Sequence, residues 1–389
     1  MKRSVVVGLT AFALSTTGLA FTASVSAAAE QPVPVSEVTG QVVSGRYIVT
    51  TRPGRAEASV AALSLAGARV RPDHVYGSAL SGFAARLDAA QLRAVQQDPN
   101  VLRIEPDQVV TASVKQRNPT WGLDRLDQRK LPLSSSYSYA GNGSGVTAYI
   151  IDTGILRAHP DFGGRASVGY DATGGSGVDC NGHGTHVAGT IGGTTYGVAK
   201  KAKLVGVRVL NCQGSGTYAD VIAGMDWVSK NAARPAVANM SLGGARSESV
   251  NEAANRIVSS GVFLAVAAGN NNGDACRNSP SSASRATSVA ASDRRDAKAS
   301  FSNYGDCTHL YAPGVDIVST WLSGGTKTAS GTSMASPHVA GVAAVRRGVR
   351  PGDSPEQVRS WLVENSTAGV IGGNPAGTPN KLLYKAPSL

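Results

Sequence analysis

Three short polar segments interrupt an otherwise apolar chain and carry side chains that could react together. Asp152 ends the apolar run 146–151, His183 begins a helical segment, and Ser333 follows a glycine-led loop. A hydroxyl nucleophile, an imidazole base and a carboxylate that orients the base are the groups needed for acyl transfer. Each residue alone could instead be a turn residue (Asp152) or a helix cap (His183, Ser333). Together they make acyl transfer the leading chemical hypothesis.

These residues lie between elements that alternate along the second part of the chain. The predicted strands are short, nearly continuous apolar runs at 146–151, 204–210, 236–242 and 262–268. The predicted helices cover 183–192, 218–232, 249–259 and 333–348, and a capping box at Ser354 opens a last one. Apolar strands alternating with helices are typical of a parallel sheet covered on both faces. We therefore predict a doubly wound, mostly parallel α/β domain over residues 114–389, with its site at the carboxyl ends of the strands.

A smaller domain is predicted over residues 28–113. Strand patterns at 46–50, 80–87 and 101–105 alternate with helical patterns at 56–66 and 89–97. This order is typical of a small α+β sandwich of ferredoxin-like pattern.

The first 27 residues have the features of a secretion signal. Lys2 and Arg3 precede a mostly apolar stretch that leads into small residues, with cleavage expected after Ala27 or Ala29. An uncleaved membrane anchor is the alternative, and no later segment approaches the length of a membrane span. We expect a secreted protein that is free of the membrane after cleavage.

Charge and cysteine content limit the remaining function classes. The net charge is 37 − 26 = +11, but no Lys/Arg run exceeds three residues, so a nucleic-acid partner is not expected. The four cysteines could form two disulfides in any of three pairings, with free thiols or a metal site as alternatives. The glycine-rich segment 141–145 precedes its strand, which favours a turn over a dinucleotide-binding loop.

The motifs themselves resemble a known family. Asp-Thr-Gly at 152–154, His-Gly-Thr-His-Val-Ala-Gly at 183–189 and Gly-Thr-Ser-Met-Ala-Ser-Pro at 331–337 are similar to the three active-site signatures of the subtilisin-like serine proteases. The resemblance is strongest to the proteinase K branch and its aqualysin-like secreted enzymes, and it covers nearly all of residues 114–389. The preceding domain resembles the inhibitory propeptide of that family. The resemblance implies a secreted serine endopeptidase made as a zymogen.

It also implies roles for individual residues. Asp152, His183 and Ser333 would form the catalytic triad and Asn270 would stabilise the oxyanion, whereas His186 and His338 would be structural. The implied substrate-binding residues are Gly214, Ser215, Gly216, Ser241, Leu242 and Gly243 on two edges, with Ala267, Ala268 and Gly269 as a pocket wall. These segments contain no acidic residue, so cleavage after large apolar or aromatic residues is expected. Expected partners are protein or peptide substrates and the chain's own propeptide, and the enzyme is expected to be a monomer.

The resemblance further implies disulfides and structural calcium, with no catalytic cofactor. Its disulfides would be Cys180–Cys212 and Cys276–Cys307. Asp124, Asp127 and Gln128 match a calcium loop, although they could form an ordinary helical turn with neighbouring arginines. A second calcium site is expected to be lost or weakened, because His309 stands where relatives have a carboxylate and imidazole is a poor calcium ligand.

Two other functions remain possible at this point. A catalytically inactive binding protein could share the fold, but the complete set Asp152, His183, Ser333 and Asn270 argues against it. A secreted esterase or lipase would use the order Ser, Asp, His and a Gly-x-Ser-x-Gly turn, which Gly331–Ala335 lacks.

Overall fold

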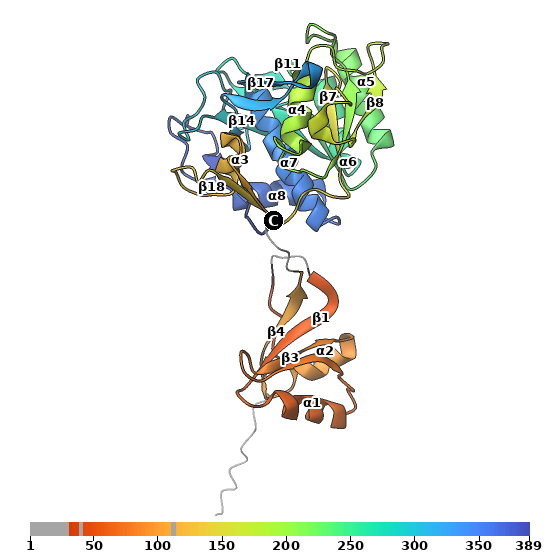
Figure 1. Ribbon diagram of the computed structural model, residues 1–389, viewed down its shortest axis with the longest axis vertical. Helices are drawn as coiled ribbons and strands as arrows, with labels where there is room; N and C mark the ends of the chain where they lie inside the picture. The colour runs from red at the N-terminus through yellow and green to blue at the C-terminus, as the bar shows by residue number, and fades with distance from the viewer. Residues whose placement is uncertain (1–30, 39–41, 110–113) are drawn as a thin grey trace, which may run out of the picture. The chain divides into compact units, whose positions relative to one another are not determined.

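The computed structural model describes residues 31–38, 42–109 and 114–389 (Figure 1). The chain forms two compact units, Met1–Val109 and Val110–Leu389, each with its own core. The secretion signal predicted for residues 1–27 lies outside the described residues. In the described part of the chain, no helix combines the length and apolar character needed to cross a membrane.

The first unit has the predicted ferredoxin-like pattern. Its elements are β1 (Val42–Thr51), α1 (Ala56–Leu65), β2 (Pro72–Tyr76), β3 (Gly82–Arg86), α2 (Ala89–Gln96) and β4 (Val101–Gln108). The strands form an antiparallel sheet in the order β2-β3-β1-β4. Val49, Phe83, Val95 and Ile104 are fully buried in its core. Strand β2 was not predicted, since His74 and Asp73 interrupt its apolar pattern.

The second unit is built on a nine-stranded sheet in the order β18-β19-β15-β14-β12-β10-β7-β9-β8. In that order the strands are Thr367–Ala368, Lys381–Leu382, Leu310–Pro313, Thr287–Ser292, Phe263–Ala267, Ala236–Met240, Thr147–Asp152, Lys203–Arg208 and Ala166–Asp171. Neighbours are parallel except the β18–β19 pair. The predicted doubly wound, mostly parallel sheet is confirmed.

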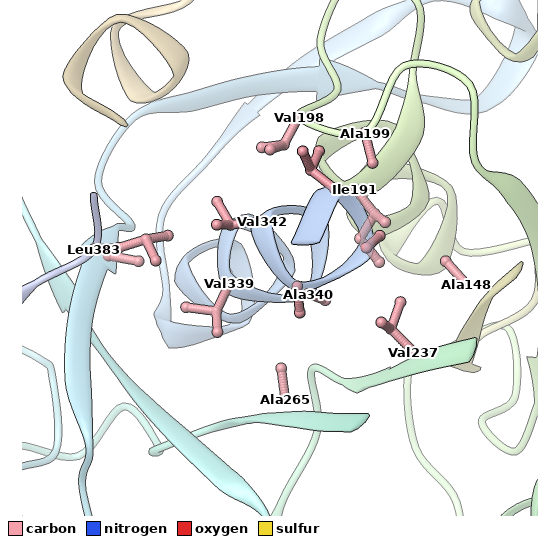
Figure 2. Close-up of a cluster of buried hydrophobic side chains, with 14 of the residues drawn as sticks. Ala148, Ile191, Val198, Ala199, Val237, Ala265, Val339, Ala340, Val342 and Leu383 are labelled. Carbon is pink, nitrogen blue, oxygen red and sulfur yellow. The ribbon is translucent and has the colours of Figure 1, made fainter. Parts of the chain in front are cut away.

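Helices cover both faces of this sheet, which explains the continuous apolar strands. One core holds α4 (His183–Gly192), α7 (Thr332–Val349) and α8 (Pro355–Asn365), and the other holds α5 (Tyr218–Asn231) and α6 (Glu248–Ser259). Along β7, Ile150 belongs to the first core and Ile151 to the second, because successive side chains point to opposite faces. Figure 2 shows Val339 and Ala340 of α7 facing strand residues of the first core.

Shorter elements complete the second unit. They are β5 (Val114–Arg117) paired with β6 (Ser136–Tyr139), β11 (Gly244–Ala245) paired with β13 (Asn278–Ser279), β16 (Ile317–Thr320) paired with β17 (Thr326–Ala329), α3 (Trp121–Leu126), and the 3₁₀ turns η1 (Pro160–Phe162), η2 (Ala275–Arg277) and η3 (Leu322–Gly324). The predicted strand 236–242 was too long. It ends at Met240, and residues 241–243 leave the sheet to line a cleft.

Candidate active site

Asp152 and His183 form a direct pair at the carboxyl end of β7. The Oδ1 atom of Asp152 lies 2.7 Å from Nδ1 of His183, the first residue of α4. The Thr153 backbone N–H donates to the same Oδ1 atom at 2.7 Å. The Asp152 side chain is fully buried, whereas that of His183 is 28% exposed. The carboxylate therefore holds one ring nitrogen while the imidazole remains accessible from the cleft.

Electrostatics distinguish His183 from His186 and His338, the other histidines near the three motifs. Burial lowers the pKa of His183, but the charge of Asp152 and its hydrogen bond raise it by more, so that the net pKa lies above the ordinary value. Burial lowers the pKa of His186 and of His338 to about 4, so both are neutral at pH 7. His186 Nε2 binds the carbonyl oxygens of Ile317 and Lys327 rather than facing the cleft.

Ser333 is the second residue of α7, and it contacts Ser241 twice. The Ser333 hydroxyl donates to the Ser241 carbonyl oxygen at 3.0 Å, and the Ser241 hydroxyl donates to the Ser333 carbonyl oxygen at 2.7 Å. Among the described residues, no hydrogen bond joins the Ser333 hydroxyl to His183. Ser333 and His183 line two adjoining pockets that share Leu242, Gly243 and Ser279.

Thr332 fixes the orientation of the Asn270 side-chain amide. Its Oδ1 atom accepts hydrogen bonds from the Thr332 backbone N–H and hydroxyl, both at 2.8 Å. The Nδ2 amino group remains available as a donor. Asn270 is exposed and lines the same pocket as Ser333. The first N–H groups of α7 lack helical acceptors and lie at the positive end of the helix dipole. The arrangement suits an anionic oxygen.

The binding residues that were predicted from the sequence line two pockets. A cleft of about 490 Å³ is lined by Gly214, Ser215, Gly216, Ser241, Leu242 and Gly243 together with His183. A pocket of about 150 Å³ is lined by Ala267, Ala268, Gly269, Asn270 and Ser333, and its described lining residues are all uncharged. Sequence reasoning missed Tyr218 and Ser279. Tyr218 lies at the wall of the cleft, where its hydroxyl donates to the Ala245 carbonyl oxygen at 2.6 Å.

The four cysteines form Cys180–Cys212 and Cys276–Cys307, the pairing that the resemblance implied. The first disulfide joins the loop before His183 to the segment that precedes Gly214. It thus connects the loop that precedes His183 to one edge of the cleft.

The residues of the expected calcium loop lie together around Ser134 and Ser138. Asp124 Oδ1 and Gln128 Oε1 both accept from the Ser134 N–H at 3.0 Å, and Asp127 Oδ2 accepts from the Ser138 N–H at 2.6 Å. Asp127 Oδ1 is buried and has no hydrogen-bond donor among the residues that the structure describes, and burial raises the pKa of this carboxyl. Among described residues there is no group of three or more His, Cys, Asp or Glu side chains that could hold a metal. Two carboxylates and one amide oxygen nevertheless suit calcium, which also binds hydroxyl and carbonyl oxygens.

His309 is half-buried, at the position where the sequence predicts that relatives have a second calcium ligand and this chain lacks it. Its Nδ1 atom accepts a hydrogen bond from the Ser288 N–H at 3.2 Å. Burial and the charge of Arg359 lower the pKa of His309 to about 4. The side chain is therefore a neutral acceptor for the backbone.

Comparisons with known proteins place the chain in a family. A family model described as the subtilase family matches residues 143–382, which is more than half of the chain. The chain belongs to the subtilase family. A second model, described as peptidase inhibitor I9, matches residues 46–113.

Individual subtilases are closely similar over most of the sequence. The chain is 52% identical over 326 residues to an extracellular serine proteinase of Thermus sp. (strain Rt41A), covering 83% of this chain and 79% of that protein. It is 44% identical to proteinase R of Parengyodontium album, covering 91% of this chain and 92% of the relative. The crystal structure of a cold-adapted subtilisin-like serine proteinase matches with a TM-score of 0.68 and 51% identity, covering 70% of this chain and 99% of that one. This subtilase is a serine endopeptidase with an inhibitor-type propeptide.

Proposed function

We propose that the subtilase cleaves peptide bonds with a triad of Asp152, His183 and Ser333. The observation that carries this proposal is the 2.7 Å contact between Asp152 Oδ1 and His183 Nδ1. It fixes the tautomer in which Nε2 of the neutral ring is free to accept a proton. The Ser333 hydroxyl leaves its bond to the Ser241 carbonyl, gives its proton to Nε2 and attacks the substrate carbonyl carbon. The resulting imidazolium then gives that proton to the leaving amine.

The negative oxygen formed in this step needs donors that are already in place. Asn270 Nδ2 and the Ser333 backbone N–H would supply them, because Thr332 holds the other end of the Asn270 amide. Donors oriented before the reaction stabilise the developing charge without reorganisation.

Substrate would bind as an added strand along residues 214–216 and 241–243 of the cleft. The small pocket beside Ser333 would receive the side chain that precedes the scissile bond. Its lining is uncharged and its wall at 267–269 is made of two alanines and a glycine. This favours large apolar or aromatic side chains over Lys or Arg.

The first unit would act as an inhibitor until it is removed by the enzyme itself. Support comes from the I9 match over residues 46–113. The junction is proposed near residues 112–114, and the signal over residues 1–27 would direct secretion. The relative from Thermus, which is named an extracellular serine proteinase, supports this localisation. Purified 28–113 added to mature enzyme should inhibit it, and a 114–389 chain refolded alone should give little activity. Full activity from 114–389 alone would contradict this role.

We also propose that Asp124, Asp127 and Gln128 hold a structural calcium ion. The buried Asp127 Oδ1 atom without a donor supports a cation at this place. The ion would stabilise the loop between α3 and β6, and no catalytic step depends on it.

Matched assays on two protein or peptide substrates and one ester test the proposed activity. Secreted protein should clear casein, release p-nitroaniline from peptides with an aromatic residue before the anilide, and leave tributyrin unchanged. Hydrolysis of tributyrin without casein cleavage would favour the esterase alternative. Binding to casein without any hydrolysis would favour an inactive binding protein.

A further inference from the structure

A third buried carboxylate lies beside the Asp152–His183 pair. Asp179 is only 4% exposed and belongs to the loop that leads from β8 into α4. We propose that Asp179 is a positioning residue for His183, because its carboxylate fixes the first turn of α4 relative to β7. This inference rests on the proposed triad and adds a residue to it.

Five hydrogen bonds converge on the two oxygens of Asp179. Oδ1 accepts from the backbone N–H groups of Asn181 at 2.9 Å and Gly182 at 2.8 Å, and from the Thr153 hydroxyl at 2.9 Å. Oδ2 accepts from the Thr185 N–H at 2.9 Å and from its hydroxyl at 2.6 Å. These donors come from the residue after Asp152, from the loop before His183 and from the turn that contains His183. One carboxylate therefore links the segments that carry the acid and the base.

Helix α4 depends on this carboxylate because it has no side-chain cap of its own. Its N-cap residue is Gly182, in a left-handed conformation with φ of 103°. Asp179 accepts hydrogen bonds from the backbone N–H groups of Gly182 and Thr185. The Thr153 hydroxyl, which donates to Asp179, accepts from the Gly184 N–H at 2.9 Å. A carboxylate at this end of a helix also interacts favourably with the helix dipole. The backbone on both sides of His183 is thus held by Asp179.

The charge of Asp179 acts on the imidazole as well. Burial lowers the pKa of His183, and the charge and hydrogen bond of Asp152 raise it. The charge of Asp179 raises this pKa further. Within the described residues, Asp179 has no ion pair with Lys or Arg. Arg208 approaches the loop at the Val178 carbonyl oxygen but makes its ion pair with Asp171.

The other charged or titratable neighbours do not replace this effect. His186, on the same helix, is neutral because its pKa is about 4. Lys327 contacts that region through its carbonyl oxygen, which accepts from His186. A direct catalytic role is excluded by geometry, because both Asp179 oxygens bind donors of the protein and Asp179 lines neither pocket. Its influence on the reaction passes through His183.

The test compares Asp179→Asn with Asp171→Asn in the full chain. Asp171 also accepts from a threonine N–H and hydroxyl, and its other bonds, among the described residues, are to the Gly177 N–H and to Arg208 rather than to α4. Active sites are counted by exhaustive fluorophosphonate labelling, and a peptide p-nitroanilide is the substrate. For Asp179→Asn we expect kcat per labelled site to fall about 10–100-fold, as for a misplacement of the base by about 1 Å, with KM nearly unchanged. The acid limb of kcat/KM should move to lower pH, whereas Asp171→Asn should keep the wild-type kcat and limb.

Wild-type kcat and acid limb in Asp179→Asn would overturn the inference, even if that variant were less stable. If Asp179→Asn does not accumulate, Thr185→Val removes the hydroxyl that donates to Asp179 at 2.6 Å and accepts from the Leu156 N–H at 3.0 Å, and leaves the carboxylate in place. It should lower kcat several-fold with the acid limb unmoved, and a wild-type kcat would again contradict the positioning role. An inactive wild-type chain would instead refute the proposed function.

Discussion

The Ser241 hydroxyl donates a 2.7 Å hydrogen bond to the carbonyl oxygen of Ser333. That carbonyl would normally accept from the N–H four residues later in α7, but Pro337 occupies this position and has no N–H. A buried carbonyl left unpaired is costly, so Ser241 completes the first turn of the helix that carries the proposed nucleophile. Asn239 and Ser336 extend this contact, since Asn239 Nδ2 donates to the Ser241 hydroxyl and Ser336 donates to Asn239 Oδ1.

Replacing Ser241 with alanine should therefore affect both stability and turnover. The unpaired Ser333 carbonyl should lower the free energy of unfolding by about 1–3 kcal/mol, and displacement of the nucleophile should lower kcat about tenfold. Ser366→Ala is the matched control, because Ser366 donates to a helical carbonyl at 2.7 Å at the end of α8, away from both pockets. Equal kcat in Ser241→Ala and Ser366→Ala would show that the Ser241 contact has no catalytic consequence.

Asn270→Leu should lower kcat about 10²–10³-fold with little change in KM, because its amide would donate to the transition state rather than to bound substrate. Thr332→Val removes one of the two donors that orient Asn270, so we expect a smaller loss of kcat in that variant. Steady-state kinetics of both variants check the order of effects. A larger loss in Thr332→Val than in Asn270→Leu would contradict the assigned role.

The raised pKa of His183 predicts how activity depends on pH. The base must be neutral, so kcat/KM should rise with pH through an apparent pKa above the ordinary histidine value of about 6.5. For stability the sign is opposite: the protonated pair contributes fully below the unfolded-state pKa, and this contribution is lost as pH rises through the folded-state pKa. His186 and His338 should not titrate in this range. An acid limb below pH 6.5 would contradict the Asp152–His183 electrostatics.

Calcium should alter thermal stability and leave the initial rate unchanged. At a free calcium concentration 100 times its dissociation constant, the ion would stabilise the fold by about 2.7 kcal/mol. EDTA should accordingly lower the midpoint of thermal inactivation, while rates measured in the cold stay the same. Asp127→Asn should weaken this calcium dependence. Identical inactivation in EDTA and in millimolar calcium would show that residues 124–128 form only a turn.

The sequence predicted the helices α4 to α8 of the second unit and the strands β7, β9, β10 and β12, because strands buried on both faces are continuous apolar runs. The other five strands of the large sheet, β8, β14, β15, β18 and β19, were not predicted. The sequence analysis placed several strand ends one or two residues too late, as in β10, which ends at Met240. The reason is that apolar residues continue beyond the last hydrogen bond between neighbouring strands. Asp179 was missed for a different reason. A single aspartate in a loop has no spacing that reveals five converging donors, and those donors come from segments up to 26 residues away.

The Ser333–Ser241 contacts could not be predicted either, since they join residues 92 positions apart. By contrast, Asp152, His183 and Ser333 were identifiable because local motifs surround each of them. What the sequence alone could not supply was the 2.7 Å contact that makes the first two a pair.

Substitution of Ser333, the proposed nucleophile, tests the proposed triad most directly. Full-length Ser333→Ala, produced in a protease-free host, should lose about six orders of magnitude in kcat for a peptide p-nitroanilide. It should also take up no fluorophosphonate and keep its propeptide attached, whereas Ser330→Ala, which removes an exposed neighbouring hydroxyl, should be processed and labelled normally. Wild-type hydrolysis by Ser333→Ala, or fluorophosphonate bound to any other residue of the wild-type enzyme, would contradict the proposed triad.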